Sequence, residues 1–110
     1  MYQHAALAAG RWRAFSLCEQ LGNIGSEIHR ARLAETSSEQ RFSAARDRAL
    51  ELFDLTLADP RWRTRIRELA RAQEIAADAL SGGREWNTSL ASLEKYFDQF
   101  AIAARSAPVS

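Results

Sequence analysis

Apolar residues recur at intervals of three and four residues along four segments of this chain of 110 residues. This spacing places side chains on one face of a helix with 3.6 residues per turn. No segment shows the two-residue alternation or the hairpin turn dipeptides that indicate β-strands. The sequence therefore predicts an all-α fold. Its four amphipathic helices are expected at about residues 11–34, 39–58, 60–80 and 88–105.

Three stretches with helix-ending or helix-starting chemistry separate these segments. Thr36 and Glu39 have the spacing of a capping box at a helix start. In Asp59-Pro60, the aspartate can cap a helix and the proline suits its first position. The glycines of Gly82-Gly83 can adopt the left-handed conformation that closes a helix. Because the connections are short, consecutive helices should be antiparallel neighbours, which predicts an up-down-up-down four-helix bundle.

The length and composition are those of a single globular domain. We expect one domain over residues 1–110, with an ordered core at about 11–105 and flexible ends. The only cysteine, Cys18, cannot form an internal disulfide, which favours a cytoplasmic location. No run approaches the roughly 20 apolar residues of a membrane span, so no membrane contact is expected.

The residue patterns of common catalytic sites are absent from the sequence. There is no Glu-x-x-His pair for a di-iron bundle, and His4 and His29 belong to no zinc-like cluster. There is no phosphate-binding Gly-x-x-x-x-Gly-Lys, and no arginine lies four to six residues before His29, as in some helical ribonuclease toxins. We therefore expect no catalytic residue, metal or cofactor, and we interpret Cys18 as a buried structural thiol.

Two glycines, Gly22 and Gly25, interrupt the first predicted helix. Each costs a helix about 1 kcal/mol relative to alanine, so a compensating contact is expected. The first interpretation is close helix packing within the bundle, with Asn23 beside the contact. The second is an interface with another subunit or partner. The third is a ligand site that uses Asn23, Ser26 and Glu27.

Arginines gather at the start of the third predicted helix. Residues 61–71 hold five arginines and one acid, a net charge of +4 in a chain of net +1. The arginines are Arg61, Arg63, Arg65, Arg67 and Arg71. On a continuous helix, three of them fall on one line and two on the adjacent line, which predicts a basic face. Arg11 and Arg13 repeat the Arg-Trp-Arg pattern near the start of the chain.

This basic face has three interpretations. Arginines on helix surfaces commonly pair with acids, and Glu39, Asp47, Glu51 and Asp54 on the second helix could neutralise some of them. Alternatively, arginine outnumbers lysine 14 to 1, and guanidinium groups favour phosphate contacts, so the face could bind RNA or DNA. Thirdly, the face could bind an acidic protein partner.

Several sequence blocks together resemble a family of small bacterial helical proteins without an established activity. These blocks are Arg11-Trp12 and residues 16–17, 19–27, 47–52, 54–56, 59–62, 93–97 and 99–101. A weaker similarity, through Asn23-Ile24-Gly25, is to the four-helix-bundle proteins of ribosomal-RNA intervening sequences and the accessory variability proteins of retroelements. The second resemblance implies an oligomeric bundle that engages nucleic acid or a reverse transcriptase.

We therefore expect a non-enzymatic accessory or adaptor protein that touches RNA or DNA through its arginine face. Its protein partner would be a nucleic-acid enzyme such as a reverse transcriptase. The alternative is a protein-interaction module or homo-oligomer without a role in nucleic-acid binding.

Overall fold

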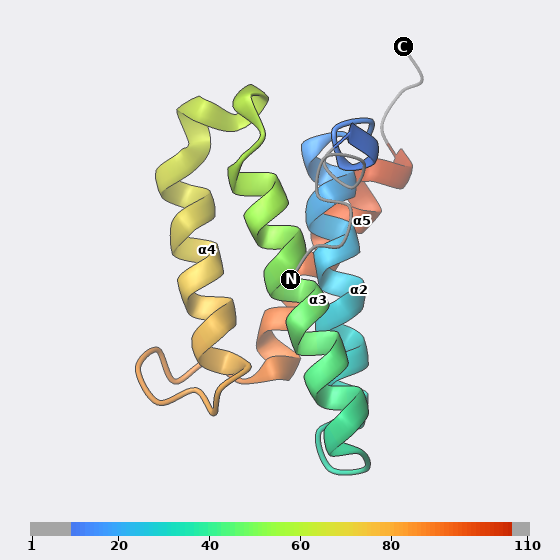
Figure 1. The fold of residues 1–110 in the computed structure, drawn as a ribbon, viewed down its shortest axis with the longest axis vertical. Helices are drawn as coiled ribbons and strands as arrows, with labels where there is room; N and C mark the ends of the chain where they lie inside the picture. The colour runs from blue at the N-terminus through green and yellow to red at the C-terminus, as the bar shows by residue number, and fades with distance from the viewer. Residues whose placement is uncertain (1–9, 107–110) are drawn as a thin grey trace.

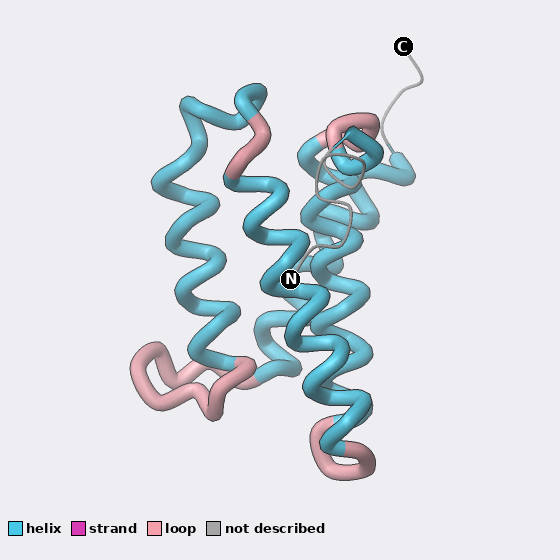
Figure 2. Tube along the Cα trace, in the orientation of Figure 1, coloured by secondary structure: helices cyan, strands magenta, loops and turns pink. Residues whose placement is uncertain are grey.

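The computed structural model describes residues 10–106, and every regular element in this part of the chain is helical (Figures 1 and 2). The prediction of an all-α fold is confirmed for these residues. The flexible ends that the sequence predicts fall mainly in residues 1–9 and 107–110, outside the described residues. The elements are α2 (Leu17–Ala34), α3 (Glu39–Leu57), the 3-10 helix η1 (Pro60–Arg65), α4 (Ile66–Ala79) and α5 (Leu90–Ser106).

The first long helix, α2, begins at Leu17 and not near residue 11 as predicted. Its start is set by a capping box: the Ser16 hydroxyl accepts from the Glu19 amide at 3.1 Å, and the Glu19 carboxylate accepts from the Ser16 amide at 2.9 Å. This exchange satisfies two amides that the helix itself leaves unpaired. Residues 10–12 form a separate helical turn that places the Trp12 side chain in the core, 5% exposed.

Helix α3 begins at Glu39 as predicted, but a different residue caps it. The Ser38 hydroxyl accepts from the Arg41 amide at 3.1 Å, so the predicted capping box of Thr36 and Glu39 is wrong. At the next corner, Asp59 accepts from the Arg61 amide at 3.1 Å, as its predicted capping role requires.

The predicted third helix is broken into two elements. From Pro60 the backbone forms the tighter η1, in which Trp62 has φ −103° and ψ 19°, and α-helix begins only at Ile66. A continuous helix from residue 60 is therefore wrong. The helix then closes at the predicted glycines, because Gly82 and Gly83 have φ of 114° and 72°.

Consecutive long helices run in opposite directions, and α2 packs against both α3 and α5 (Figure 1). Ten of the 18 residues of α2 are buried, including its aliphatic stripe. In contrast, α4 buries only Leu69, Ala76 and Ala79, and it packs loosely on α3 and α5. None of the helices in the described part of the chain is both long and apolar enough to cross a membrane.

Gly22 and Gly25 lie where α2 meets α5. A Cβ atom at Gly22 would lie 3.0 Å from the Cα of Ala101, and one at Gly25 would lie 2.8 Å from the Cβ of Phe97. Real Cβ atoms essentially never approach as closely as at Gly25, and the approach at Gly22 is tighter than nine in ten real Cβ contacts. Glycine at both positions therefore suits this close separation of the two helices. The contact lies within this chain and compensates for the helix cost of the two glycines.

Candidate functional site

The break at η1 changes the arginine face that the sequence predicts. A 3-10 helix has three residues per turn and an α-helix 3.6, so Arg63 does not continue the line of Arg67 and Arg71. Arg61 and Arg65 likewise lie on η1 and not on an α-helix. The prediction of two arginine lines on one continuous helix is wrong, because it extended the α-helical period through the Pro60 corner.

Three of the five arginines have partners within the chain. Arg61 binds Asp59, and Arg65 pairs with Glu68 at 2.9 Å. Arg71 lies 5.1 Å from the centroid of the Trp86 ring and 4.0 Å from a carboxylate oxygen of Glu74. These contacts hold the three side chains against the protein.

Arg63 and Arg67 are exposed and make no side-chain hydrogen bond or ion pair with the described residues. Arg11 and Arg13 are also exposed, on either side of the buried Trp12. These four side chains can still reach a partner.

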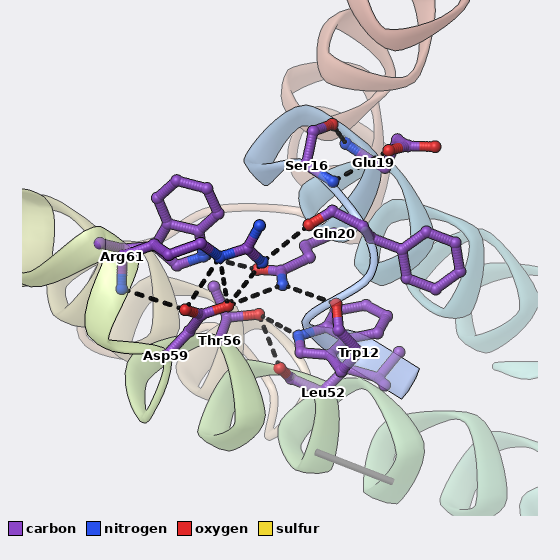
Figure 3. A network of polar contacts seen from close by, with 10 residues as sticks. Trp12, Ser16, Glu19, Gln20, Leu52, Thr56, Asp59 and Arg61 are labelled. Atoms are coloured by element: carbon purple, nitrogen blue, oxygen red, sulfur yellow. Dashed lines mark hydrogen bonds and ion pairs between the residues drawn. The ribbon is translucent and has the colours of Figure 1, made fainter. Parts of the chain in front are cut away.

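The Arg-Trp-Arg repeats meet in a buried polar cluster that sequence reasoning missed (Figure 3). Gln20 is fully buried and lies at its centre. Its amide nitrogen donates to the Trp12 carbonyl at 2.9 Å and to Asp59 at 3.3 Å, while its oxygen accepts from the Trp62 indole at 2.8 Å. The Trp12 indole donates to the Thr56 hydroxyl at 2.9 Å. The cluster thus joins the start of α2, the end of α3 and η1.

Asp59 supplies the charge of this cluster. Its side chain is fully buried, and the Arg61 guanidinium donates to both carboxylate oxygens, at distances from 2.7 to 3.2 Å. These hydrogen bonds outweigh burial and lower the pKa of Asp59. Arg61 also donates to the Phe15 carbonyl at 2.8 Å, which fixes the turn before α2.

The hydrogen bonds of the cluster hold the start of α2, the end of α3 and η1 together. Among the described residues, Glu27 Oε1 is the one buried side-chain oxygen or nitrogen without a hydrogen-bond partner, so the polar atoms of the cluster are all paired. The buried polar groups of the cluster are hydrogen-bonded to one another, as buried polar groups in proteins usually are. The repeated Arg-Trp-Arg pattern was the signal that could have revealed it, because a buried indole N–H requires an acceptor.

An open apolar groove runs between α4 and α5. It encloses about 370 Å³, and the side chains of Ala72, Ile75, Leu93 and Phe97 form its walls. Tyr96 lies at its edge, 46% exposed. Arg71, held against the Trp86 ring, also lines it.

A much smaller hollow of about 10 Å³ shares part of the groove's lining and is also lined by Leu21 of α2, Leu69 and Phe100. The loose packing of α4 leaves this surface open. An apolar groove of this kind can hold the apolar face of a helix.

The other chemical candidates from the sequence do not come together. His29 pairs with Glu94 on α5, which also binds Arg32. Burial opposes ionisation of Glu94, but the hydrogen bonds from Arg32 and His29 outweigh it and lower the pKa of this carboxyl. The sequence predicted that Cys18 is buried, but in the structure it is only partly buried. No group of three metal-ligating side chains occurs within residues 10–106.

The third interpretation of the glycine segment is a ligand site of Asn23, Ser26 and Glu27. Asn23 and Ser26 line one open hollow between α2 and α5, but Glu27 does not. Asn23 donates to the Glu19 carbonyl at 2.8 Å and Ser26 to the Gly22 carbonyl at 3.3 Å, so both return to the backbone of α2. Glu27 instead binds Arg48 on α3 at 3.1 Å. Glu27 therefore does not join Asn23 and Ser26 in a common site.

Comparisons with known proteins add no family to this geometry. The chain matches no family model, no curated protein and no solved structure. The resemblances drawn from the sequence stay predictions, and the function is argued from the surfaces described above.

Proposed function

We propose that this chain is a non-enzymatic adaptor protein, an antiparallel four-helix bundle that binds an amphipathic helix of a protein partner in the α4–α5 groove. The observation that carries the proposal is the groove itself, an open apolar surface between α4 and α5, which make little contact with each other. In helix-in-groove recognition, a partner helix buries its apolar face in such a surface.

The side chains at the groove suit this role. Tyr96 stands edge-on to Phe97 with ring centroids 5.1 Å apart, so its ring is held rigidly while nearly half of the residue is exposed. Arg71 is likewise oriented by the Trp86 ring. Tyrosine, tryptophan and arginine are enriched among the residues that dominate binding energy at protein interfaces. Little side-chain freedom would be lost on binding.

The test is selection of helical peptides from a display library on the intact protein. Selected peptides should carry apolar residues at helical spacing. Their affinity should fall about tenfold or more for Ala72→Glu, which puts a charge in the groove, in keeping with the energies of interface anchors. Ala91→Glu is the matched control, because Ala91 is exposed on α5 and does not line the groove. Equal loss in both variants would contradict the proposal.

The same variants test the homo-oligomer alternative. If the groove binds a second copy of the chain, sedimentation velocity should show a dimer of the wild type that dissociates in Ala72→Glu and persists in Ala91→Glu. A monomer that still binds the selected peptides supports a different protein as the partner.

A second candidate function is contact with RNA or DNA, and the exposure of Arg63 and Arg67 without partners favours it. Changing Arg63, Arg67 and Arg71 to glutamine should make the salt dependence of binding shallower by up to about three units, roughly one per phosphate contact. A control with Arg46, Arg84 and Arg105 changed to glutamine removes the same charge elsewhere. This function fails if the wild type binds no oligonucleotide at low salt, or if both triple variants bind equally.

A further inference from the structure

A second groove lies where α2 turns into α3, and it shares no residue with the α4–α5 groove. It encloses about 420 Å³. Its apolar floor is formed by Leu33, Ala34 and Ala44, and Leu33 is 58% exposed. Ser37 and three arginines, Arg30, Arg41 and Arg48, complete its lining. None of the described lining residues is acidic.

The buried carboxylate of Glu27 binds two of these arginines. Oε2 of Glu27 accepts from Arg30 at 2.9 Å and from Arg48 at 3.1 Å, while Glu27 itself is only 8% exposed. The two arginine side chains remain 60% and 52% exposed. Each guanidinium has five N–H donors, so both retain donors that can point outward.

The third arginine adds a positive charge that has no ion-pair partner among residues 10–106. The side chain of Arg41 is exposed and makes no hydrogen bond or ion pair with the described residues. Because Glu27 supplies one negative charge against three arginines, the groove keeps an excess of positive charge. The groove therefore combines an apolar floor with a basic rim.

We propose that this α2–α3 groove binds an acidic amphipathic segment of another protein. An apolar side chain of that segment covers Leu33, Ala34 and Ala44, and its carboxylates bind the arginines at the rim. Guanidinium groups bind carboxylates through paired hydrogen bonds, which suits this arrangement. The α4–α5 groove lies elsewhere on the molecule, so the chain would have a separate surface for each of two partners. The proposal for the α2–α3 groove does not depend on the proposal for the α4–α5 groove.

Charge complementarity alone would also fit a phosphate chain, but the floor of the groove favours a peptide. The lining residues include no aromatic side chain on which a base could stack. A phosphate backbone would leave Leu33 uncovered, whereas an amphipathic segment would bury it.

The probe is a fluorescein-labelled helical peptide that has leucines four residues apart, flanked by glutamates. Fluorescence anisotropy should show binding to the wild-type protein. A peptide with every glutamate replaced by glutamine, and a single-stranded RNA oligonucleotide, are the comparison ligands. Equal binding of the glutamine peptide, or displacement of the acidic peptide by the oligonucleotide at lower concentration, would overturn the proposal.

Two variants locate the binding. Arg41→Gln and Ala44→Glu should each weaken binding of the acidic peptide about tenfold, the usual scale for an interface anchor. Arg84→Gln and Ala91→Glu carry the same charge changes at exposed positions outside the groove and should leave affinity unchanged. Equal weakening by variants and controls would place the peptide elsewhere and refute the proposal.

The α4–α5 variant Ala72→Glu separates the two grooves. It should leave binding of the acidic peptide intact, because Ala72 does not line the α2–α3 groove. Circular dichroism melts of every variant check that the fold is retained. Arg41 and Ala44 are both exposed, so little loss of stability is expected.

Discussion

Gly25 on α2 lies so close to Phe97 on α5 that a Cβ atom added to the glycine would lie 2.8 Å from the Cβ of Phe97. The neighbour is the stiff base of a fully buried side chain and not a flexible end. Relief of the overlap must therefore move the two helices apart.

We predict that Gly25→Ala lowers thermal stability, although alanine is the better helix former by about 1 kcal/mol. Overpacking costs about 1–3 kcal/mol, so the net effect should be a fall of a few degrees in Tm. Gly10→Ala is the control, because nothing lies within 4 Å of its added Cβ. A higher Tm for Gly25→Ala in calorimetry would show that the helices can separate without loss.

The second prediction concerns Gln20. Gln20→Leu leaves the Trp62 indole without its acceptor and the Trp12 carbonyl without its side-chain donor. The Trp12 carbonyl still accepts from the Phe15 amide, so the Trp62 indole is the group left unpaired. An unpaired buried polar group costs about 1–3 kcal/mol, so the free energy of unfolding should fall by at least about 1 kcal/mol in urea titration. Gln99→Leu, at an exposed position on α5, should change it by no more than about 0.5 kcal/mol.

A double-mutant cycle tests the same contact independently. Trp62→Phe removes the donor that Gln20 accepts from. With both partners gone, the loss in Gln20→Leu/Trp62→Phe should be smaller than the sum of the two single losses. Strict additivity would mean that the hydrogen bond contributes nothing to stability.

The third prediction is a pH dependence that comes from Asp59. Arg61 lowers the pKa of Asp59 in the folded state below the ordinary value of 3.8. The folded state therefore binds this proton less tightly than the unfolded state. The stabilisation is fully present above pH 3.8 and is lost as the pH falls through the lowered folded pKa.

Asp59→Asn removes that titration. The pKa values of Asp78 and Glu94 are also lowered. The wild-type protein and the Asp59→Asn variant should therefore both lose stability in acid. The difference in unfolding free energy between wild type and Asp59→Asn isolates Asp59, and it should shrink as the pH falls below 3.8. A difference that stays constant from pH 6 to pH 2 would rule out this account of the pair.

The fourth prediction concerns the local stability of α4. Hydrogen-exchange mass spectrometry should show faster exchange for the amides of α4 than for those of α2, because α4 buries Leu69, Ala76 and Ala79 and α2 buries ten residues. A bound helix in the α4–α5 groove should slow exchange in α4. Equal protection of α4 and α2 in the unbound protein would contradict the loose packing.

The sequence by itself determined the features that depend on neighbours along the chain. The apolar spacing predicted the long helices, because the 3.6-residue period is a property of a single segment. The start of α3 at Glu39, the capping role of Asp59 and the closure at Gly82 follow from local backbone chemistry. The close approach at Gly22 and Gly25 was foreseeable from the helix cost of glycine, although its partner helix was not.

Only the tertiary structure decided which side chains meet across the chain. Trp12 binds Thr56, 44 residues away, and Trp62 binds Gln20, 42 residues away. The repeated tryptophans signal that buried indole donors need acceptors, but no local pattern identifies the residues that accept from them. The same holds for Glu27, which a surface pattern would expose but which α3 covers and pairs with Arg48. The two grooves also arise from tertiary structure, because an opening depends on how closely two helices pack, and that distance depends on contacts made by the whole fold.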